Sequence, residues 1–354
     1  MNHIIKFCIS LLIVPLFLLG CSQYNNDERK INDGFSKSDT PTLQKIKINE
    51  ILKPGALVLL KNYIVIQNEY NSNEDCFFVY TRDEIKFCYS FGRLGKSRTD
   101  DEFIAPRIIE NTNKDCLPVL EQAGQTIYFY EISSKNHTLS RKCKINTDNN
   151  LPLQEFILTN DSILIYRNTL QELCSYNLNS DSIIDKITFN TDIKKKSGNN
   201  YNKENDSYSF TFQDTIISIG FTFINKIIKG NFTKEYHFKF NKDEIKSGYL
   251  DLKKRYNNYT YYMFLSSTKK YIFAQYMGLP FKVFQPFPFN PSGRNFNIFM
   301  EVYDWEMNKK LLIDFKTDIL RFTIDEKNNC MYTWNPLKDF DYLYKYKLPS
   351  FNDE

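Results

Sequence analysis

The chain has little histidine, glycine or proline. Its 354 residues include three His, 12 Gly and 12 Pro. Metal centres and Ser-His-Asp triads need histidines with suitable partners. Only His137 and His237 lie beyond the N-terminal segment, and they fall in separate predicted sheets. The sequence also lacks the HExxH, GxSxG and phosphate-loop motifs. We therefore predict no metal and no cofactor, and we assign no catalytic residue.

Neither sign of charge dominates. The 46 Lys and Arg residues accompany 42 Asp and Glu, which leaves a net charge of +4. Nucleic-acid-binding domains carry a basic stripe, whereas the strongest candidate here, Lys194–Lys196, is typical of a solvated loop. The acidic groups Asp100–Glu102 and Asp339 with Asp341 are typical of solvated turns rather than of a glycosidase pair or a calcium loop. No nucleic-acid partner is predicted.

The N-terminal apolar run is too short to span a bilayer. This run, Leu11–Leu19, follows the short polar start Asn2–Lys6. The phrase Leu18-Leu19-Gly20-Cys21 at its end resembles the lipobox of bacterial lipoproteins, in which the signal peptidase cuts before the cysteine and that cysteine takes the lipid. We predict a signal peptide at residues 1–20 and a lipid on Cys21, which makes the membrane a partner without a crossing segment. The alternative is an ordinary small-residue cleavage site.

Six cysteines remain once Cys8 leaves with the signal peptide and Cys21 takes the lipid, out of eight in all. An oxidising exported setting permits disulfides among them, and free buried thiols are an equal alternative. Cys76 and Cys88 are candidates to face each other across a hairpin that turns near Thr81–Asp83. No CxxC pair supports a zinc ribbon or a thioredoxin-type site.

Aromatic residues are abundant, with 24 Tyr and 30 Phe. Both favour half-buried strands, and Asn, Asp and Ser supply the turns that glycine and proline do not. The segment at residues 21–42 is polar without an apolar period, so we predict a flexible tether there. Alternation of polar and apolar residues starts at Leu43–Ile48 and predicts the first strand.

Short strand patterns recur in six sets of roughly 50 residues, a period typical of a propeller with inserted loops. The sets begin at Ala56, Leu117, Gln154, Tyr208, Tyr261 and Leu320. The last set has one strand too few, and Leu43–Ile48 would complete it. We predict an all-β fold over residues 43–350, a six-bladed β-propeller of four-stranded antiparallel blades closed by an N-terminal strand. Radial repetition protects sheet edges. The alternative is a pair of β-sandwiches divided near Asp192–Ser207.

The stretch Phe91–Pro106 is predicted to link the first set of strands to the second. Gly92 and Gly95 supply the backbone freedom that a tight connection needs. Phe91 and Phe103 are placed to pack this turn onto the sheets on either side.

Three phrases carry a family resemblance that extends over most of the mature chain. The phrase Phe91–Pro106 resembles a blade-ending F-G-x-x-G-x-G-P-x-E-F-x-x-P, without the Gly-Pro pair. Lys270–Tyr276 and Phe322–Tyr332 resemble a strand and a closing hairpin of the same family. The family is that of the TolB-like, six-bladed propeller lipoproteins of Bacteroides-type bacteria. The resemblance implies a lipid-anchored propeller in the cell envelope, in the outer membrane, with its periplasmic or surface face left open and no settled activity.

An aromatic, proline-rich loop is the strongest candidate for a binding surface. It lies between residues 278 and 296 and includes Phe284, Phe287 and Arg294. Rigid aromatic loops form preorganised contact surfaces for sugars or proteins, although such rings also seal cores. Arg93 and Tyr276, with Trp305 and Trp334, are further channel or rim candidates that packing would also explain.

We predict a binding or interaction module for a protein or a glycan, with contacts made by loops at the ends of the blades. The alternatives are a carbohydrate-active hydrolase or lyase with its site at the central channel, and a purely structural envelope component.

Overall fold

The structure is a computed structural model. It describes residues 34–38, 40–50, 54–68, 74–95, 99–111, 113–123, 125–147, 153–159, 162–168, 172–188, 207–212, 215–220, 223–228, 233–238, 259–280, 298–317, 319, 321–335 and 339–349.

All regular secondary structure in these residues is β-strand. The strands form six hydrogen-bonded sheets within the described part of the chain. We number the sheets in chain order. No helix in the described residues is long and apolar enough to cross a membrane.

Sheets 1 to 3 each take consecutive strands. Sheet 1 contains β3 (Pro54–Leu59), β4 (Tyr63–Asn68), β5 (Asp75–Thr81), β6 (Phe87–Leu94) and β7 (Glu102–Phe103). Sheet 2 contains β8 (Pro106–Ile108), β9 (Cys116–Glu121), β10 (Thr126–Ile132) and β11 (His137–Lys144). Sheet 3 contains β12 (Leu153–Thr159), β13 (Ile163–Asn168), β14 (Glu172–Asn177) and β15 (Ser182–Thr188).

Sheet 4 is again consecutive, whereas sheets 5 and 6 each add one strand from near the N-terminus. Sheet 4 contains β16 (Ser207–Phe212), β17 (Thr215–Gly220), β18 (Phe223–Ile228) and β19 (Thr233–Phe238). Sheet 5 contains β20 (Tyr259–Ser267), β21 (Tyr271–Pro280), β22 (Phe299–Asp304), β23 (Lys309–Asp314) and β1 (Ser36–Lys37). Sheet 6 contains β24 (Phe322–Asp325), β25 (Cys330–Asn335), β26 (Asp339–Lys347) and β2 (Leu43–Lys47).

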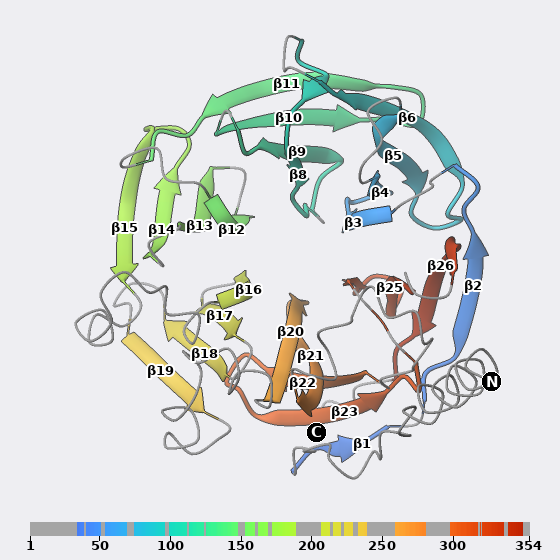
Figure 1. The fold of residues 1–354 in the computed structure, drawn as a ribbon, viewed down its shortest axis with the longest axis vertical. Coiled ribbons are helices and arrows are strands. Elements are labelled where there is room, and N and C mark those ends of the chain that lie inside the picture. The colour runs from blue at the N-terminus through green and yellow to red at the C-terminus, as the bar shows by residue number, and fades with distance from the viewer. Residues whose placement is uncertain are drawn as a thin grey trace, which may run out of the picture. The chain divides into compact units, whose positions relative to one another are not determined.

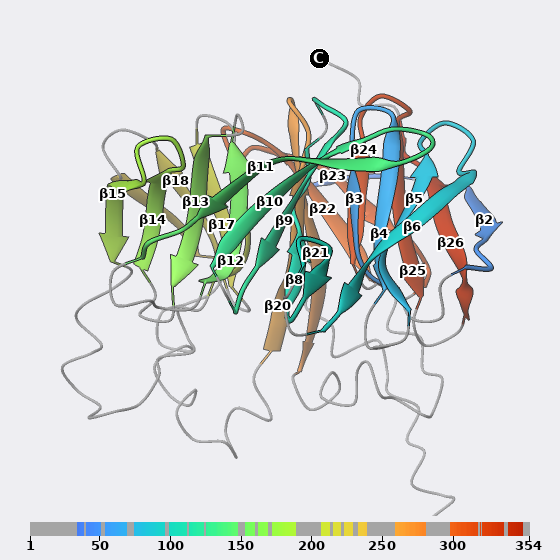
Figure 2. The same cartoon turned by 90° about the horizontal axis from the view of Figure 1, so that it is seen from above.

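The sheets are arranged around a central axis, and their strands run along it (Figures 1 and 2). The strands nearest the axis are β3, β8, β12, β16, β20 and β24, each the first of its own consecutive run. Along this inner circle β24 contacts β3, β3 contacts β8, and β12, β16, β20 and β24 contact in turn. This arrangement is a β-propeller. It excludes the alternative of two separate sandwiches.

Both faces of a sheet are covered by neighbouring sheets, which explains the many nearly continuous apolar strands. In β9 and β10 nearly every residue is buried. Separate hydrophobic clusters fill the junctions of sheet 1 with sheet 2, sheet 6 with sheet 1, and sheet 2 with sheet 3. The largest fully buried side chains are mostly tyrosines and phenylalanines, so the aromatic richness of the sequence is used in these junctions.

The predicted closure by the strand at Leu43–Ile48 is confirmed. Strand β2 pairs antiparallel with β26, with Leu43 opposite Tyr346 and Lys47 opposite Tyr342. Closing the ring in this way removes an unpaired edge from the last sheet.

Part of the predicted tether is structured, which corrects its boundary. Strand β1 pairs in parallel with β23, with Ser36 opposite Leu311. The ring of Phe35 packs edge-on against Tyr303, with their centroids 5.2 Å apart. Phe35 is the one aromatic residue in the described part of this polar stretch, and it packs onto sheet 5. A single aromatic residue produces no apolar periodicity, so the sequence pattern did not predict this contact.

The predicted link between the first two strand sets is also confirmed, because β6 and the short β7 end sheet 1 and β8 begins sheet 2. Gly92 has a φ of +75°, and a Cβ there would lie 2.9 Å from the Phe77 ring. Phe91 and Phe103 are buried, as expected. The Phe103 ring contacts Phe77 of sheet 1 at 5.4 Å and Tyr128 of sheet 2 at 5.6 Å between centroids.

The six cysteines of the described chain are free. Register explains why the expected pair does not form. Phe77 lies opposite Phe91 and Tyr80 opposite Phe87, so Cys76 lies at the open end of the hairpin and Cys88 near its turn. Burial raises the pKa of the Cys76 thiol to about 12, which makes it a poor nucleophile.

Candidate functional site

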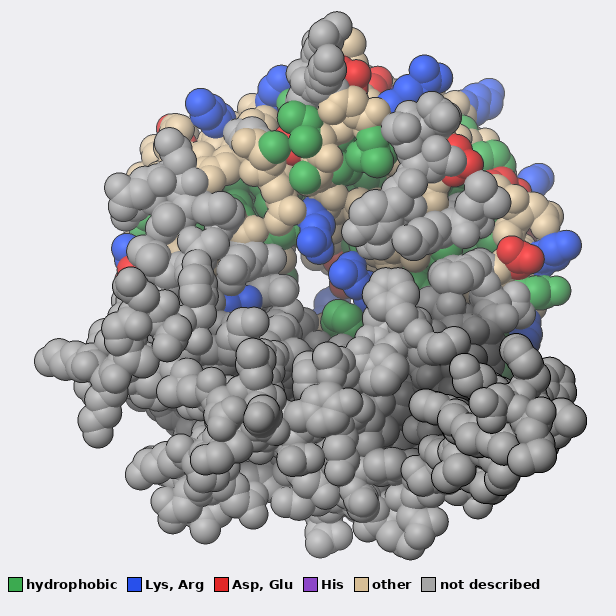
Figure 3. Space-filling view, viewed as in Figure 1, with side chains coloured by type: hydrophobic (Ala, Val, Ile, Leu, Met, Phe, Trp, Pro, Cys, Tyr) green, Lys and Arg blue, Asp and Glu red, His purple; other side chains and the backbone are tan. Residues whose placement is uncertain are grey.

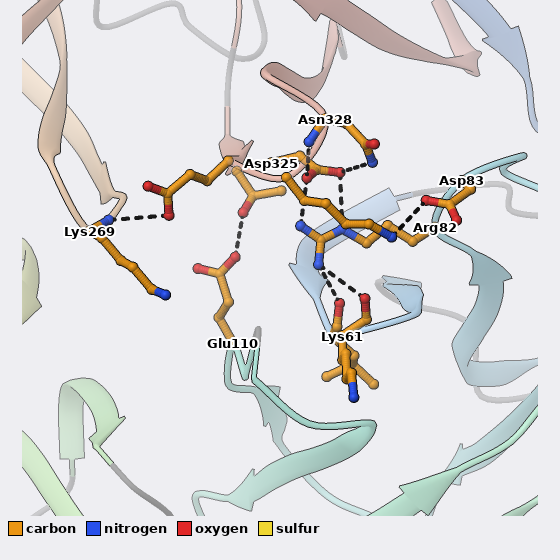
Figure 4. Close-up of polar contacts among 11 residues, drawn as sticks. Lys61, Arg82, Asp83, Glu110, Lys269, Asp325 and Asn328 are labelled. Atoms are coloured by element: carbon orange, nitrogen blue, oxygen red, sulfur yellow. Dashed lines mark hydrogen bonds and ion pairs between the residues drawn. The ribbon is translucent and has the colours of Figure 1, made fainter. Parts of the chain in front are cut away.

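A buried ion pair joins sheet 6 to sheet 1 near the axis (Figure 4). Arg82, in the turn after β5, donates to the Asp325 carboxylate at 3.0 Å through Nε and at 2.5 Å through Nη2. Its Nη1 donates to the carbonyl oxygens of Leu60 and Lys61 at 2.8 and 3.2 Å. The side chains of Arg82 and Asp325 are 5% and 0% exposed. We call these two residues the clasp.

The carboxylate of the clasp is fully occupied. Asn328 donates to it twice, from its backbone nitrogen at 3.0 Å and from its side-chain amide at 2.9 Å. Desolvation acts to raise the pKa of Asp325, but the hydrogen bonds from Arg82 and Asn328 outweigh it and the pKa is lowered. Desolvation likewise acts to lower the pKa of Arg82, and the bond to Asp325 outweighs it. Both groups stay charged, and Asp325 has no face left for a ligand.

A second polar contact spans the inner side of β3. Thr323 of β24 donates its hydroxyl to Glu110, just beyond β8, at 2.7 Å (Figure 4). The Glu110 carboxyl reaches solvent, yet protein surrounds it around the axis. Desolvation raises its pKa against hydrogen bonds from Thr323 and from the backbone of Leu59. Desolvation of the Glu110 carboxyl therefore favours its protonated form.

The turns around this contact are linked from sheet to sheet. The backbone nitrogen of Lys269 donates to Glu326 at 3.3 Å, which joins sheet 5 to sheet 6. Lys327 lies 3.2 Å from Asp83, which adds an exposed ion pair between sheets 6 and 1. Lys61 donates from its backbone to the carbonyl of Lys114 in sheet 2 at 3.1 Å. These contacts fix the same end of four neighbouring sheets as one rigid surface.

The axis itself is hollow, and Lys and Arg side chains gather around its opening (Figure 3). Two arginines lie on or beside innermost strands. Arg107 is exposed in β8 between the buried residues Pro106 and Ile108. Arg321 immediately precedes β24, and its guanidinium carbon lies 5.7 Å from the centre of the Phe264 ring.

The structure does not bring the described candidates from the sequence together. Arg93 lies on β6, three strands away from the axis, and its side chain is 78% exposed beside Asp75 at 3.7 Å. Tyr276 is 1% exposed and packs against Tyr262 with centroids 5.6 Å apart. Tyr276 is thus a core residue, as the packing alternative requires, and Arg93 is not a channel residue.

The remaining candidates have mixed outcomes. Trp334 is buried, and Trp305 donates its indole N–H to the carbonyl of Thr268 at 3.2 Å, so both have packing roles. Phe284, Phe287, Arg294 and Cys21 lie outside the described residues.

Histidine chemistry finds no support at the axis. The His137 ring stacks on Phe91 with centroids 3.9 Å apart, and its Nε2 lies 3.3 Å from Asp101 at the outer part of the sheets. Among the described residues, no three His, Cys, Asp or Glu side chains converge as metal ligands.

Sequence reasoning missed the clasp and Glu110. Arg82 and Asp325 are 243 positions apart, and neither lies in a pattern that predicts a contact. A signal did exist, because Asp325 and Asn328 both belong to the hairpin phrase Phe322–Tyr332 that carries the family resemblance.

Comparisons with solved structures agree on the fold. A Bacteroides fragilis protein named "Putative exported protein" has a TM-score of 0.55 and 12% identity over 89% of this chain and 99% of its own. A member of the duf4221 family from Bacteroides vulgatus has a TM-score of 0.52 and 10% identity over 87% and 98%. A chain of the mitotic checkpoint complex has a TM-score of 0.50 and 10% identity over 93% and 98%.

Comparisons of the sequence find no matching family and no matching curated protein. At these identities the structural likenesses establish the fold alone. The chain is similar to β-propeller proteins that include proteins of Bacteroides.

Proposed function

We propose that this protein is a lipid-anchored, six-bladed propeller of the bacterial cell envelope that binds a protein or a glycan. Support for six blades comes from the six sheets and from the closing pair β2–β26. Likeness to a Bacteroides protein named as exported supports an envelope location, and the three phrases that resemble TolB-like propellers support that family. The lipobox-like phrase at Cys21 supports the anchor, in the outer membrane.

The observation that carries the binding role is the hollow axis with its gathered Lys and Arg side chains (Figure 3). The innermost strands that bound the axis are hydrogen-bonded into their sheets, and a surface held in place before binding loses little entropy on binding. The aromatic loop with Phe284, Phe287 and Arg294 remains a proposed second contact.

The anchor is tested by replacing Cys21 with alanine. The variant should move from the detergent-dependent membrane fraction to the soluble fraction, since one lost lipid attachment removes the stable anchor. A variant that still needs detergent would refute lipidation at Cys21.

The binding role is tested by retention of envelope glycans and proteins on the immobilised protein, with and without residues 282–290. Retention by the intact chain is expected. If neither glycans nor proteins are retained, the binding role is wrong; if the shortened chain retains them equally, only the aromatic loop is excluded.

A hydrolase or lyase at the central channel is the second candidate. Glu110 favours it, because a solvent-accessible carboxyl with a raised pKa suits a general acid. Glycosidases need a second carboxylate facing the first, and the clasp occupies Asp325. Glu110→Gln should abolish any glycan cleavage if this candidate is correct, and unchanged cleavage would exclude Glu110 as the acid.

A further inference from the structure

Three innermost strands end at the same level. The carboxyl ends of β3 and β8 meet through the parallel bridge between Leu60 and Asn111. The carboxyl end of β24 reaches the same place, because Asp325 holds Arg82 and Arg82 holds the carbonyl of Leu60. These strands therefore run in one direction along the axis.

That common direction places two arginines at a similar depth. Arg107 lies three residues before Glu110, and Arg321 lies two residues before Thr323. At about 3.3 Å per residue, their backbones lie roughly 10 and 7 Å from the level of the Glu110–Thr323 bond, on the same side. Both positions adjoin the axis, and Figure 3 shows basic side chains gathered at its opening.

The surroundings of these arginines suit a ligand with both charge and a carbon face. Arg107 is exposed and has no ion pair with another residue of the described chain. The backbone of Arg321 is fixed, since its carbonyl accepts the Thr333 hydroxyl at 2.5 Å, and its guanidinium covers the Phe264 ring. A guanidinium binds carboxylates through two parallel hydrogen bonds, and an aromatic ring offers an apolar face to a sugar.

We propose that the axial opening at Arg107 and Arg321 binds an acidic saccharide through its carboxylate groups. The inference rests on the proposed binding function and names its ligand class. Charge complementarity favours an anionic ligand, and the Phe264 ring beside Arg321 favours one with a carbon face, as a sugar has. Glu110 lies three residues after Arg107, and its carboxyl accepts a hydrogen bond from Thr323.

The test is calorimetric titration of the intact protein with trigalacturonate, its methyl ester and acetate. The wild type should bind trigalacturonate, with affinity that falls as salt is added. Arg107→Ala should weaken it about tenfold or more, the size expected for a lost charged hydrogen bond, and Arg107→Lys should lose less. Lys144→Ala is the matched control, because Lys144 is exposed on β11, at the outer edge of the same sheet. It should stay within about twofold of wild type, as expected for a distant surface charge.

Several results would overturn the inference. These are no binding of trigalacturonate, equal binding of the methyl ester, acetate competing as strongly as the trisaccharide, or equal losses in Arg107→Ala and Lys144→Ala. Circular dichroism of each variant checks that it folds. Retention of other envelope glycans or proteins by the wild type would leave the binding function standing while this ligand class fails.

Discussion

Sheet 1 meets its two neighbours in different ways. Against sheet 2 it packs rings, with Phe77, Phe91 and Phe103 interlocked with Tyr128 and Tyr130. Against sheet 6 an apolar cluster is supplemented by the buried clasp.

Chain connectivity accounts for the contrast. Only residues 104–105 separate β7 of sheet 1 from β8 of sheet 2, so the short connection keeps these two sheets together. Sheets 1 and 6 lie at opposite ends of the sequence. A buried charge pair is directional, and such pairs are best attested where they fix register. We infer that the clasp selects the correct closure of the ring.

Breaking the clasp should have the largest effect. Asp325→Ala leaves the Arg82 guanidinium buried without its partner and should destabilise the fold by about 3–5 kcal/mol, measured by urea unfolding. The double variant Arg82→Met with Asp325→Leu should recover most of this loss, because no charge is left buried. If the double variant is as unstable as Asp325→Ala, the loss of stability comes from packing and not from an unpaired buried charge.

Crowding the aromatic junction should have a smaller effect. Gly92→Ala requires a left-handed backbone and places a Cβ 2.9 Å from the buried Phe77 ring, so we expect a loss of about 2 kcal/mol in thermal unfolding. Gly95→Ala is the control, because its φ is not in the left-handed region and the three atoms nearest to its Cβ all belong to the flexible side chain of Glu102. Equal losses at the two glycines would contradict the close approach at Gly92.

The stability of the fold should depend on pH in opposite ways through Asp325 and Glu110. The folded pKa of Asp325 is lowered, so its contribution is present above the unfolded pKa of about 3.9 and is lost as pH falls through the folded value. The folded pKa of Glu110 is raised, so stability falls as pH rises through that value.

Glu110→Gln should therefore remove the slope above the unfolded Glu pKa of about 4.3 and leave the acid limb intact. Unfolding free energies measured from pH 3 to 8 on both proteins test this, with the smallest expected effect of the three. Identical pH profiles would show that Glu110 is not desolvated in the folded chain.

Sequence pattern predicted the strands well because both faces of most sheets are covered, which produces apolar runs bounded by polar turns. It also predicted the packing of Phe91 and Phe103, since two aromatics flanking a glycine turn have few other places to go. It could not predict the clasp, because an ion pair between remote positions leaves no local period. For a related reason it left Tyr276 open between a rim and a core position, since a tyrosine suits both equally.

Sheet 6 combines a strand from near the N-terminus with three strands from the C-terminal end of the chain, so it can form only late in synthesis. Its outer strand comes from residues 43–47 and its neighbour from residues 339–347, so a ribosome must make nearly the whole protein before the circle can shut. Strand β2 therefore waits for its partner β26 throughout synthesis. A product truncated before residue 339 would leave β2 unpaired and would remove Leu343 from the cluster between sheets 6 and 1, so an unfinished chain would expose an open strand edge to quality-control proteases.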